Sequence, residues 1–428
     1  MSDMTMIWLL IGVFMLLTIL RVPVAFSLAG SSLLVLLLAG RGPIVLVQRM
    51  YASLEFYPLL AIPFFMLVGV LMSHGSSMDR ILNISRAFIG HKKGSLAHIN
   101  VLVSMLFAGV SGTSTSDVAG IGSILIPAMK RSGYPGPFSV AITAASSTMG
   151  TIIPPSVLMV VFGSVANVSI ARMFLAGAIP GIMVGVAQMI YTYVLAKKYN
   201  WPSNEQVSWL EKLRSLKQGI LPMMVPVIII GGIFGGIFTA TEAGAVAAVY
   251  AVFVGVLYKD ITLKNIGKIF GQSARTLALP LFAIAASTVF GWLLSYLDAP
   301  SSISRFIIGI SDSRYVGLFF IFMIFFVVGC FIDGVPAIII FAPIAMSIAR
   351  ALGIPDIQVG IVICMTASLG LITPPFGLCL LLATKIGQIE IIPAIKAVLP
   401  FIALFILIVF LVIFFPPVAT MLPNLLMG

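Results

Sequence analysis

Charge is scarce in this sequence. Only 9% of the 428 residues are charged, whereas 60% are hydrophobic and the mean hydropathy is +1.18. Water-soluble domains carry about 25% charged residues. Apolar segments of about 20 residues, long enough to span a bilayer, recur along the chain. The composition excludes an ordinary water-soluble domain and predicts an all-α polytopic membrane protein.

Cysteine and histidine are also rare, with three residues of each. Neither type shows the spacing of metal ligands or of a disulfide framework. A Walker motif and a long soluble segment are absent from the sequence, so we expect no ATP hydrolysis in this chain. The net charge of +11 comes from short basic stretches between apolar segments, which set membrane orientation and do not indicate nucleic-acid binding. The segment from Met1 to Leu20 lacks a basic start and a small-residue cleavage site, which predicts a retained span.

Two stretches interrupt the apolar background. Five of the six residues from 111 to 116 carry a hydroxyl group, and Asp117 follows them. Residues 146–155 contain Gly150 and end in Pro154-Pro155. Glycine and proline break helices, and irregular backbone survives in a bilayer only where it is buried in protein or lines a wet cavity. The two stretches therefore predict a site.

The order of apolar and polar segments predicts two halves, residues 1–196 and 219–428, joined by an interfacial arm at 197–218. In the first half, we expect a short loop with Arg41 and Arg49, a re-entrant hairpin at 95–131 and a broken helix at 138–166. In the second half, we expect a hairpin at 316–350 and a broken helix at 357–383.

The halves share landmarks at a nearly constant offset in the numbering. Gly150, Pro154 and Pro155 correspond to Gly370, Pro374 and Pro375 at an offset of 220, Gly133 and Pro135 correspond to Gly353 and Pro355 at the same offset, and Pro63 corresponds to Pro280 at an offset of 217. Both predicted hairpins carry an acid near the tip, Asp117 and Asp333. Several landmarks at one offset indicate an internal repeat.

The distribution of basic residues predicts how the halves are oriented. Placing residues 80–93, 197–217 and 259–275 in the cytoplasm puts 18 of the 24 Lys and Arg residues inside, as the positive-inside rule requires. The six outside are Arg41, Arg49, Arg172, Arg305, Arg314 and Arg350. The same assignment starts the two halves on opposite sides of the membrane, so the repeats are expected to be inverted.

Inverted repeats with broken helices are typical of secondary transporters, whose sites lie near the bilayer midplane. The N-terminal end of a half-helix offers free N–H groups to an anion. A C-terminal end offers carbonyl groups that, with one or two hydroxyls, suit a dehydrated Na⁺. The two predicted hairpin tips and the two predicted helix breaks each provide an N-terminal and a C-terminal helix end, so each half of the chain can contribute to both an anion site and a cation site.

Several segments resemble the large membrane subunit of a tripartite ATP-independent periplasmic (TRAP) transporter. They are residues 109–117, 126–129, 133–135, 146–156, 169–181, 238–243 and 331–333 together with Pro343. The resemblance covers essentially the whole chain. It implies an elevator-type transporter in the cell inner membrane, with a scaffold and a mobile transport domain. It also implies coupling to Na⁺, a separate small four-helix membrane subunit, a periplasmic substrate-binding protein, and organic anions such as C4-dicarboxylates and sialic acids.

The repeat and the resemblance together give candidate site residues, with no catalytic residue and no cofactor other than Na⁺ as coupling ion. Expected substrate contacts are Ser111, Gly112, Thr113, Ser114, Thr115, Ser116, Ser156 and Asp333. Expected Na⁺ contacts are Ser111, Asp117, Thr148, Gly150, Thr151, Gly329, Asp333, Ser368, Gly370 and Thr373, with one ion between each hairpin tip and the break of its own half. Expected structural residues are Glu242, Pro154, Pro155, Pro374 and Pro375.

Other interpretations of these residues remain open at this point. Small hydroxyl residues also let membrane helices approach closely, and each of Asp117, Glu242 and Asp333 can serve as a structural cap. Four basic residues, Lys130, Arg131, Arg172 and Arg275, can meet a substrate carboxylate or act as interfacial anchors. The alternative functions are a binding-protein-independent anion transporter, an intramembrane hydrolase and an assembly subunit without transport. The hydrolase lacks a base, because no His or Lys lies near Asp117.

Overall fold

The computed structural model describes residues 3–73, 75–203 and 206–428, and these residues form helices and no strand. Within them, six helices are long and apolar enough to cross a membrane, or seven if the bent pair formed by residues 44–54 and 57–73 counts as one. The helical fold predicted from composition is confirmed.

The first half contains α1 (Asp3–Ile19), α2 (Val24–Leu38), α3 (Ile44–Leu54), η1 (Tyr57–Leu60), α4 (Ala61–Ser73), α5 (Ser76–Ile89), α6 (Ser95–Ser111), α7 (Ser114–Arg131), α8 (Gly136–Ser147), η2 (Thr148–Thr151), α9 (Val157–Ala166) and α10 (Ile170–Lys198). The second half contains α11 (Trp209–Phe234), α12 (Ala240–Leu257), α13 (Ile266–Tyr296), α14 (Ala299–Ile310), α15 (Arg314–Gly329), α16 (Gly334–Ala351), α17 (Asp356–Gly370), α18 (Leu378–Gly387), α19 (Ile391–Phe414) and α20 (Pro417–Met427).

Helix boundaries repeat between the halves. Helices α7 and α16 each have 18 residues, and both of their ends differ by the same offset of 220 in the numbering. The starts of α8 and α17 show this offset as well. Proline precedes the first residue at both of these starts, because its fixed φ suits the turn into a helix: Pro135 precedes α8 and Pro355 precedes α17. The landmarks at a constant offset therefore correspond to equivalent helix ends.

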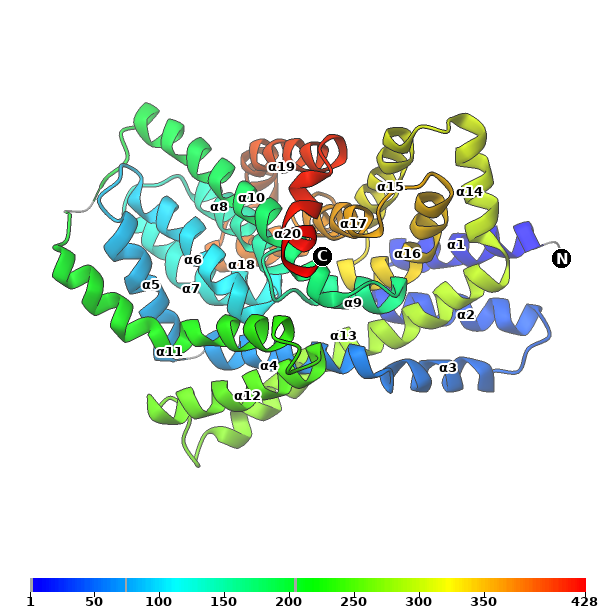
Figure 1. The fold of residues 1–428 in the computed structure, drawn as a ribbon, viewed down its shortest axis with the longest axis horizontal. Coiled ribbons are helices and arrows are strands. Elements are labelled where there is room, and N and C mark those ends of the chain that lie inside the picture. Colours follow the sequence, from blue (N-terminus) through cyan, green and yellow to red (C-terminus); the bar gives the residue numbers. More distant parts are fainter. Residues whose placement is uncertain (1–2, 74, 204–205) are drawn as a thin grey trace.

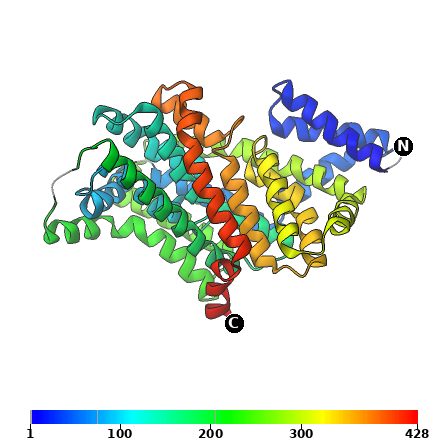
Figure 2. The same cartoon turned by 90° about the horizontal axis from the view of Figure 1, so that it is seen from above.

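We name two sets of helices, which can be followed by their labels in Figure 1 and by their colours in Figures 1 and 2. We call α1–α5 and α11–α14 the frame: α1 packs on α2, α2 and α3 pack on α13, α4 packs on α12, and α5 packs on α11. We call α6–α10 and α15–α20 the central body, in which α7 and α8 pack on α18, α9 packs on α16, and α15 packs on α17. In Figure 1, α3, α4 and α12 lie along the lower edge, with α17 and α19 above them. The two sets meet where α4, α5 and α11 pack on α6 and where α13 and α14 pack on α16.

Two frame segments differ from the sequence-based expectation. Arg41 lies in a loop as expected, but Arg49 belongs to α3, which meets the next helical segment at a bend of 63°. The predicted arm at 197–218 overlaps the end of α10 and the first turns of α11, and residues 204–205 lie outside the described residues. Helix α11 starts within this polar stretch because Ser208 and Glu211 form a capping box, which satisfies free N–H groups in the first turn.

Candidate functional site

The first hairpin tip places a carboxylate in a fully buried position. Helix α6 ends at Ser111, Gly112 adopts a left-handed φ of 63°, and extended Thr113 leads into α7. Only glycine suits position 112, because an added Cβ would be strained at this φ and would lie 3.1 Å from the carbonyl oxygen of Pro155. Asp117 lies in the first turn of α7, and its Oδ1 accepts a hydrogen bond from the Ser111 hydroxyl. Within the described chain, Asp117 Oδ2 and Thr113 Oγ1 are buried and have no hydrogen-bond partner.

The first break packs directly against this tip. A Cβ added to Gly150 would collide with Asp117 Oδ2 and would lie 3.2 Å from the carbonyl carbon of Thr113. The Ser114 and Thr151 hydroxyls are 3.1 Å apart, and the Val157 N–H donates to the Gly112 carbonyl at 3.3 Å. The close approach of Gly150 leaves the free carboxylate oxygen of Asp117 beside the 3₁₀-helical backbone of η2.

Ser156 holds the outgoing half of this broken helix in place. Its hydroxyl accepts the Met159 N–H at 3.3 Å, which caps α9, and donates to the Thr151 carbonyl at 2.6 Å. Ser156 is fully buried, and both of its hydrogen bonds are made to backbone groups at the break. Pro154 and Pro155, which are joined by a cis peptide bond, are buried beside it.

The second tip and the second break are also in contact. A Cβ on Gly370 would lie 2.6 Å from the carbonyl oxygen of Gly329, so the two backbones touch. Asp333 caps α16, because its Oδ1 accepts the Gly334 N–H at 2.7 Å. The Phe376 N–H donates to the Cys330 carbonyl at 3.3 Å. Each tip therefore contacts the break of its own half.

A hydrogen bond joins the two breaks to each other. The hydroxyls of Thr151 and Ser368 are 2.7 Å apart, and both are buried. Four helices, α7, α9, α16 and α18, start at these tips and breaks, and α6, α8, α15 and α17 end there or continue into η2. The positive ends of four helix dipoles and the negative ends of four others thus meet in one region, which can stabilise an anion and a cation side by side.

Two cavities open onto this region. A small cavity of about 70 Å³ is lined by Thr113, Ser114, Thr115, Thr151 and Asp333, together with apolar side chains. A larger one of about 470 Å³ lies between the frame and the second tip, and it includes Gly329 and Gly370. Thr115 and Asp333 line both cavities.

The remaining predicted residues lie behind the cavity walls or apart from them. The buried ones that line neither cavity are Ser111, Gly112, Asp117, Thr148, Gly150, Ser156, Ser368 and Thr373. Ser116 is half-buried and also lines neither cavity. Pro374 is half-buried and Pro375 is exposed, and a cis peptide bond joins them. Glu242 is exposed, lines neither cavity and forms a capping box with Thr239 at the start of α12.

Some residues near the site were not predicted. Arg21, from the turn between α1 and α2, is the basic side chain among those lining the 470 Å³ cavity, and Pro280 of α13 lines both cavities. Behind the first break, the Asn100 amide donates to the Thr143 hydroxyl at 2.7 Å and its carbonyl accepts from Ser146 at 2.9 Å. A lone asparagine in an apolar helix was the available signal for this network.

Interrupted helices that meet around cavities lined in part by hydroxyl and carboxyl groups are typical of helical membrane transporters. The fold itself resembles that of the solved YdaH transporter of Alcanivorax borkumensis, with a TM-score of 0.59 and 14% identity, covering 87% of this chain and 88% of that one. Residues 11–418 match the family described as "Tripartite ATP-independent periplasmic transporter, DctM component".

Full-length relatives support the same family. The chain is 36% identical to the sialic acid TRAP transporter large permease protein SiaM of Vibrio cholerae, covering 95% of this chain and 96% of that one. It is also 36% identical to the C4-dicarboxylate TRAP transporter large permease protein DctM of Pseudomonas aeruginosa, covering 94% of each. The chain belongs to the family of TRAP transporter large permease subunits, and it is a multi-pass membrane protein of organic-acid transport and not an enzyme.

Proposed function

We propose that this permease uses a Na⁺ gradient to import a small organic anion across the inner membrane. The substrate class is a C4-dicarboxylate, a sialic acid or a related sugar or keto acid, as the names of the relatives suggest. The observation that carries the sodium proposal is the buried, unpartnered Oδ2 of Asp117, which lies against Gly150 at the end of a half-helix. A buried carboxylate oxygen without a donor is expensive unless a cation or a proton joins it.

The first Na⁺ is assigned to the contact between tip one and break one. Its proposed ligands are drawn from Ser111, Asp117, Thr148, Gly150 and Thr151, of which the Ser111 hydroxyl already bonds the Asp117 carboxylate. Hydroxyl, carbonyl and carboxylate oxygens are ligands that suit a hard cation. Removing one ligand is expected to weaken Na⁺ binding while leaving the packing of the hairpin in place.

The second Na⁺ is assigned to the equivalent contact in the other half. Its proposed ligands are Gly329, Asp333, Ser368, Gly370 and Thr373. The backbone contact between Gly329 and Gly370 supports this assignment because it places two ends of interrupted helices together. The substrate carboxylate is assigned to the hydroxyl-lined cavities nearby, where Thr113, Ser114 and Thr115 offer donors beside the N-terminus of α7. Ser111, Gly112, Ser116, Ser156 and Asp333 complete the proposed substrate set.

The proposed mechanism moves the central body against the frame. Under the positive-inside orientation, Arg21 faces the cytoplasm, so the 470 Å³ cavity opens on that side. The halves are then inverted repeats, and the matching helix boundaries support a repeat in which each half supplies one tip and one break. The proposed partners are a small four-helix membrane subunit and a periplasmic binding protein that delivers the anion.

Uptake into liposomes tests this function. The chain is reconstituted with the small membrane subunit and the binding protein that neighbouring genes encode. Uptake of succinate, sialic acid and keto acids is then measured with and without an inward Na⁺ gradient. We expect uptake of one acid that requires Na⁺, and Ser111→Ala or Thr373→Ala should raise the half-saturating Na⁺ concentration. Uptake that ignores the Na⁺ gradient would refute sodium coupling.

A further inference from the structure

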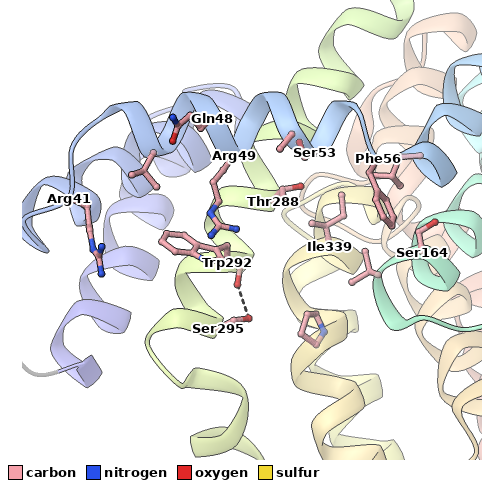
Figure 3. A pocket seen from close by; sticks show the side chains of 16 residues that line it. Arg41, Gln48, Arg49, Ser53, Phe56, Ser164, Thr288, Trp292, Ser295 and Ile339 are labelled. Carbon is pink, nitrogen blue, oxygen red and sulfur yellow. Dashed lines mark hydrogen bonds between the residues drawn. The ribbon is translucent and has the colours of Figure 1, made fainter.

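A third cavity contains none of the residues of the two hairpin tips. It has a volume of about 850 Å³ and is drawn in Figure 3. The frame forms one wall, through α3, the loop before it and α13, and the central body forms the other through Ser164 of α9 and Ile339 of α16. Helices α9 and α16 start at the first break and the second tip, and the cavity borders the C-terminal end of α9 and the middle of α16.

Two arginines line this cavity, and each contacts an aromatic ring of α13: Trp292 in the cavity wall, and Tyr296 beside it. The Arg49 guanidinium lies 4.1 Å from the centroid of the Trp292 ring, and Figure 3 shows it pointing from α3 toward this ring. Arg41 Nη2 donates to the Tyr296 hydroxyl at 2.9 Å, and its guanidinium lies 5.4 Å from that ring. Gln48 also lines the cavity.

Neither arginine is neutralised by an acid. In the described part of the chain, the ion pair within 4 Å is Arg305 with Asp298, on the exposed surface of α14. A guanidinium that stacks on an aromatic face keeps its in-plane N–H groups free to bind a carboxylate or a phosphate in two-pronged fashion. The cavity is also in the size range of small-molecule sites.

We propose that the Arg41–Arg49 cavity binds the oxyanion group of a small molecule, a carboxylate or a phosphate, at a site separate from the hairpin tips. Such a ligand bridges the frame and the central body, because its charged group meets Arg49 while its remainder lies against α9 and α16. A soluble organic acid and an anionic lipid headgroup both supply this chemistry.

Tryptophan fluorescence of the purified full chain tests the proposal. Trp8, Trp201 and Trp209 are replaced by Phe, so that Trp292 reports on its neighbour Arg49. Potassium succinate, potassium phosphate, dihexanoyl phosphatidylglycerol and dihexanoyl phosphatidylcholine are each titrated in Na⁺-free buffer at constant ionic strength. We expect a saturable change, and Arg49→Gln should raise the half-saturating concentration about tenfold or more, the effect of losing a charge-assisted bidentate contact.

Matched variants separate binding from general effects. Arg305→Gln removes an exposed arginine elsewhere and should leave the titration within twofold of the parent. Arg49→Lys keeps the charge but loses the planar fork, so its half-saturating concentration should fall between those of the parent and Arg49→Gln. The unfolding temperature of each variant confirms that it is folded.

The outcomes identify the ligand or overturn the site. If succinate or phosphate gives a saturable response, the ligand is a soluble anion. If phosphatidylglycerol gives a saturable response while phosphatidylcholine, succinate and phosphate give none, the ligand is an anionic lipid headgroup. No saturable response, or one that Arg49→Gln leaves unchanged, overturns the proposal. Because the measurement needs neither a Na⁺ gradient nor transport, its failure is distinguishable from failure of sodium coupling.

Discussion

Asp117 is the residue on which the proposed chemistry most depends. One of its carboxylate oxygens is bonded to Ser111, and the other has no partner within the described residues. In low-dielectric surroundings, this oxygen attracts a cation far more strongly than it would in water. The glycine at position 150 lets the backbone of η2 approach this oxygen closely, because a side chain at that position would collide with it.

Asp117→Asn is predicted to raise the half-saturating Na⁺ concentration for uptake about tenfold or more. The amide keeps the shape of the side chain but removes the charge, and a tenfold change corresponds to about 1.4 kcal/mol of binding free energy. The measurement is initial uptake in liposomes over a range of Na⁺ concentrations. An unchanged Na⁺ dependence in a folded variant would show that Asp117 is a structural acid.

Glu242 provides the matched control for that prediction. Its carboxylate accepts hydrogen bonds at 2.8 Å from the N–H and the hydroxyl of Thr239, so its role is to cap α12. Glu242→Gln weakens this capping box and should lower stability slightly. We therefore expect a slightly lower unfolding temperature in detergent and the Na⁺ dependence of the parent protein.

At the scale of the helices, the proposed site can be tested at the close contact between the second tip and the second break. Helices α15 and α17 both end where Gly329 meets Gly370, and their backbones touch without a side chain between them. Gly370→Ala places a methyl group 2.6 Å from the Gly329 carbonyl oxygen and must push the tip away. We predict a loss of about 1–3 kcal/mol in stability and strongly reduced uptake.

Gly231→Ala is the control for this helix-level prediction. Gly231 lies within α11, and a Cβ there would meet nothing within 4 Å. Alanine is favoured over glycine in a helix by about 1 kcal/mol, so this variant should be as stable as the parent or slightly more stable. If both variants unfold and transport alike, the contact between tip and break has no special role.

The helices that surround the tips were more predictable from sequence than the frame. The bounds of α6 and α7 coincide with the expected hairpin at 95–131, because glycine and hydroxyl residues mark the turn in an apolar background. The start of α11 was missed because a polar stretch resembles a separate arm, although its Ser-x-x-Glu pattern was present. The hydrogen bond between the Thr151 and Ser368 hydroxyls and the position of Arg21 in the wall of the 470 Å³ cavity could not be predicted. Both depend on how segments that are distant in the sequence pack together, which no local pattern encodes.

For the whole molecule, the two groups of helices and the two larger cavities suggest relative movement. The 470 Å³ cavity and the 850 Å³ cavity both lie between the frame and the central body. In the proposed orientation, Arg21 borders the first on the cytoplasmic side and Arg41 borders the second on the opposite side. A sliding movement of the central body would enlarge one cavity and close the other, which is how alternating access would arise.

Cross-linking the central body to the frame is predicted to stop transport. In a background without Cys330, Cys364 and Cys379, the variant Gly109→Cys with Pro226→Cys joins α6 to α11, since a Cβ on Gly109 lies 3.1 Å from the Pro226 Cβ. This separation is close to the range of a disulfide. The control pair, Phe64→Cys with Gly244→Cys, joins α4 to α12 within the frame at 3.0 Å.

Oxidation should affect the two pairs differently. The bond between α6 and α11 should reduce Na⁺-driven uptake at least about tenfold, and a reducing agent should restore it, because a covalent bond holds the central body in one position. The bond between α4 and α12 should leave uptake within twofold, because both helices belong to the frame. The extent of cross-linking is measured on the same samples by mass spectrometry. Full uptake by protein with a complete α6–α11 bond would mean that these helices do not move apart, and the boundary between frame and central body would have to be redrawn.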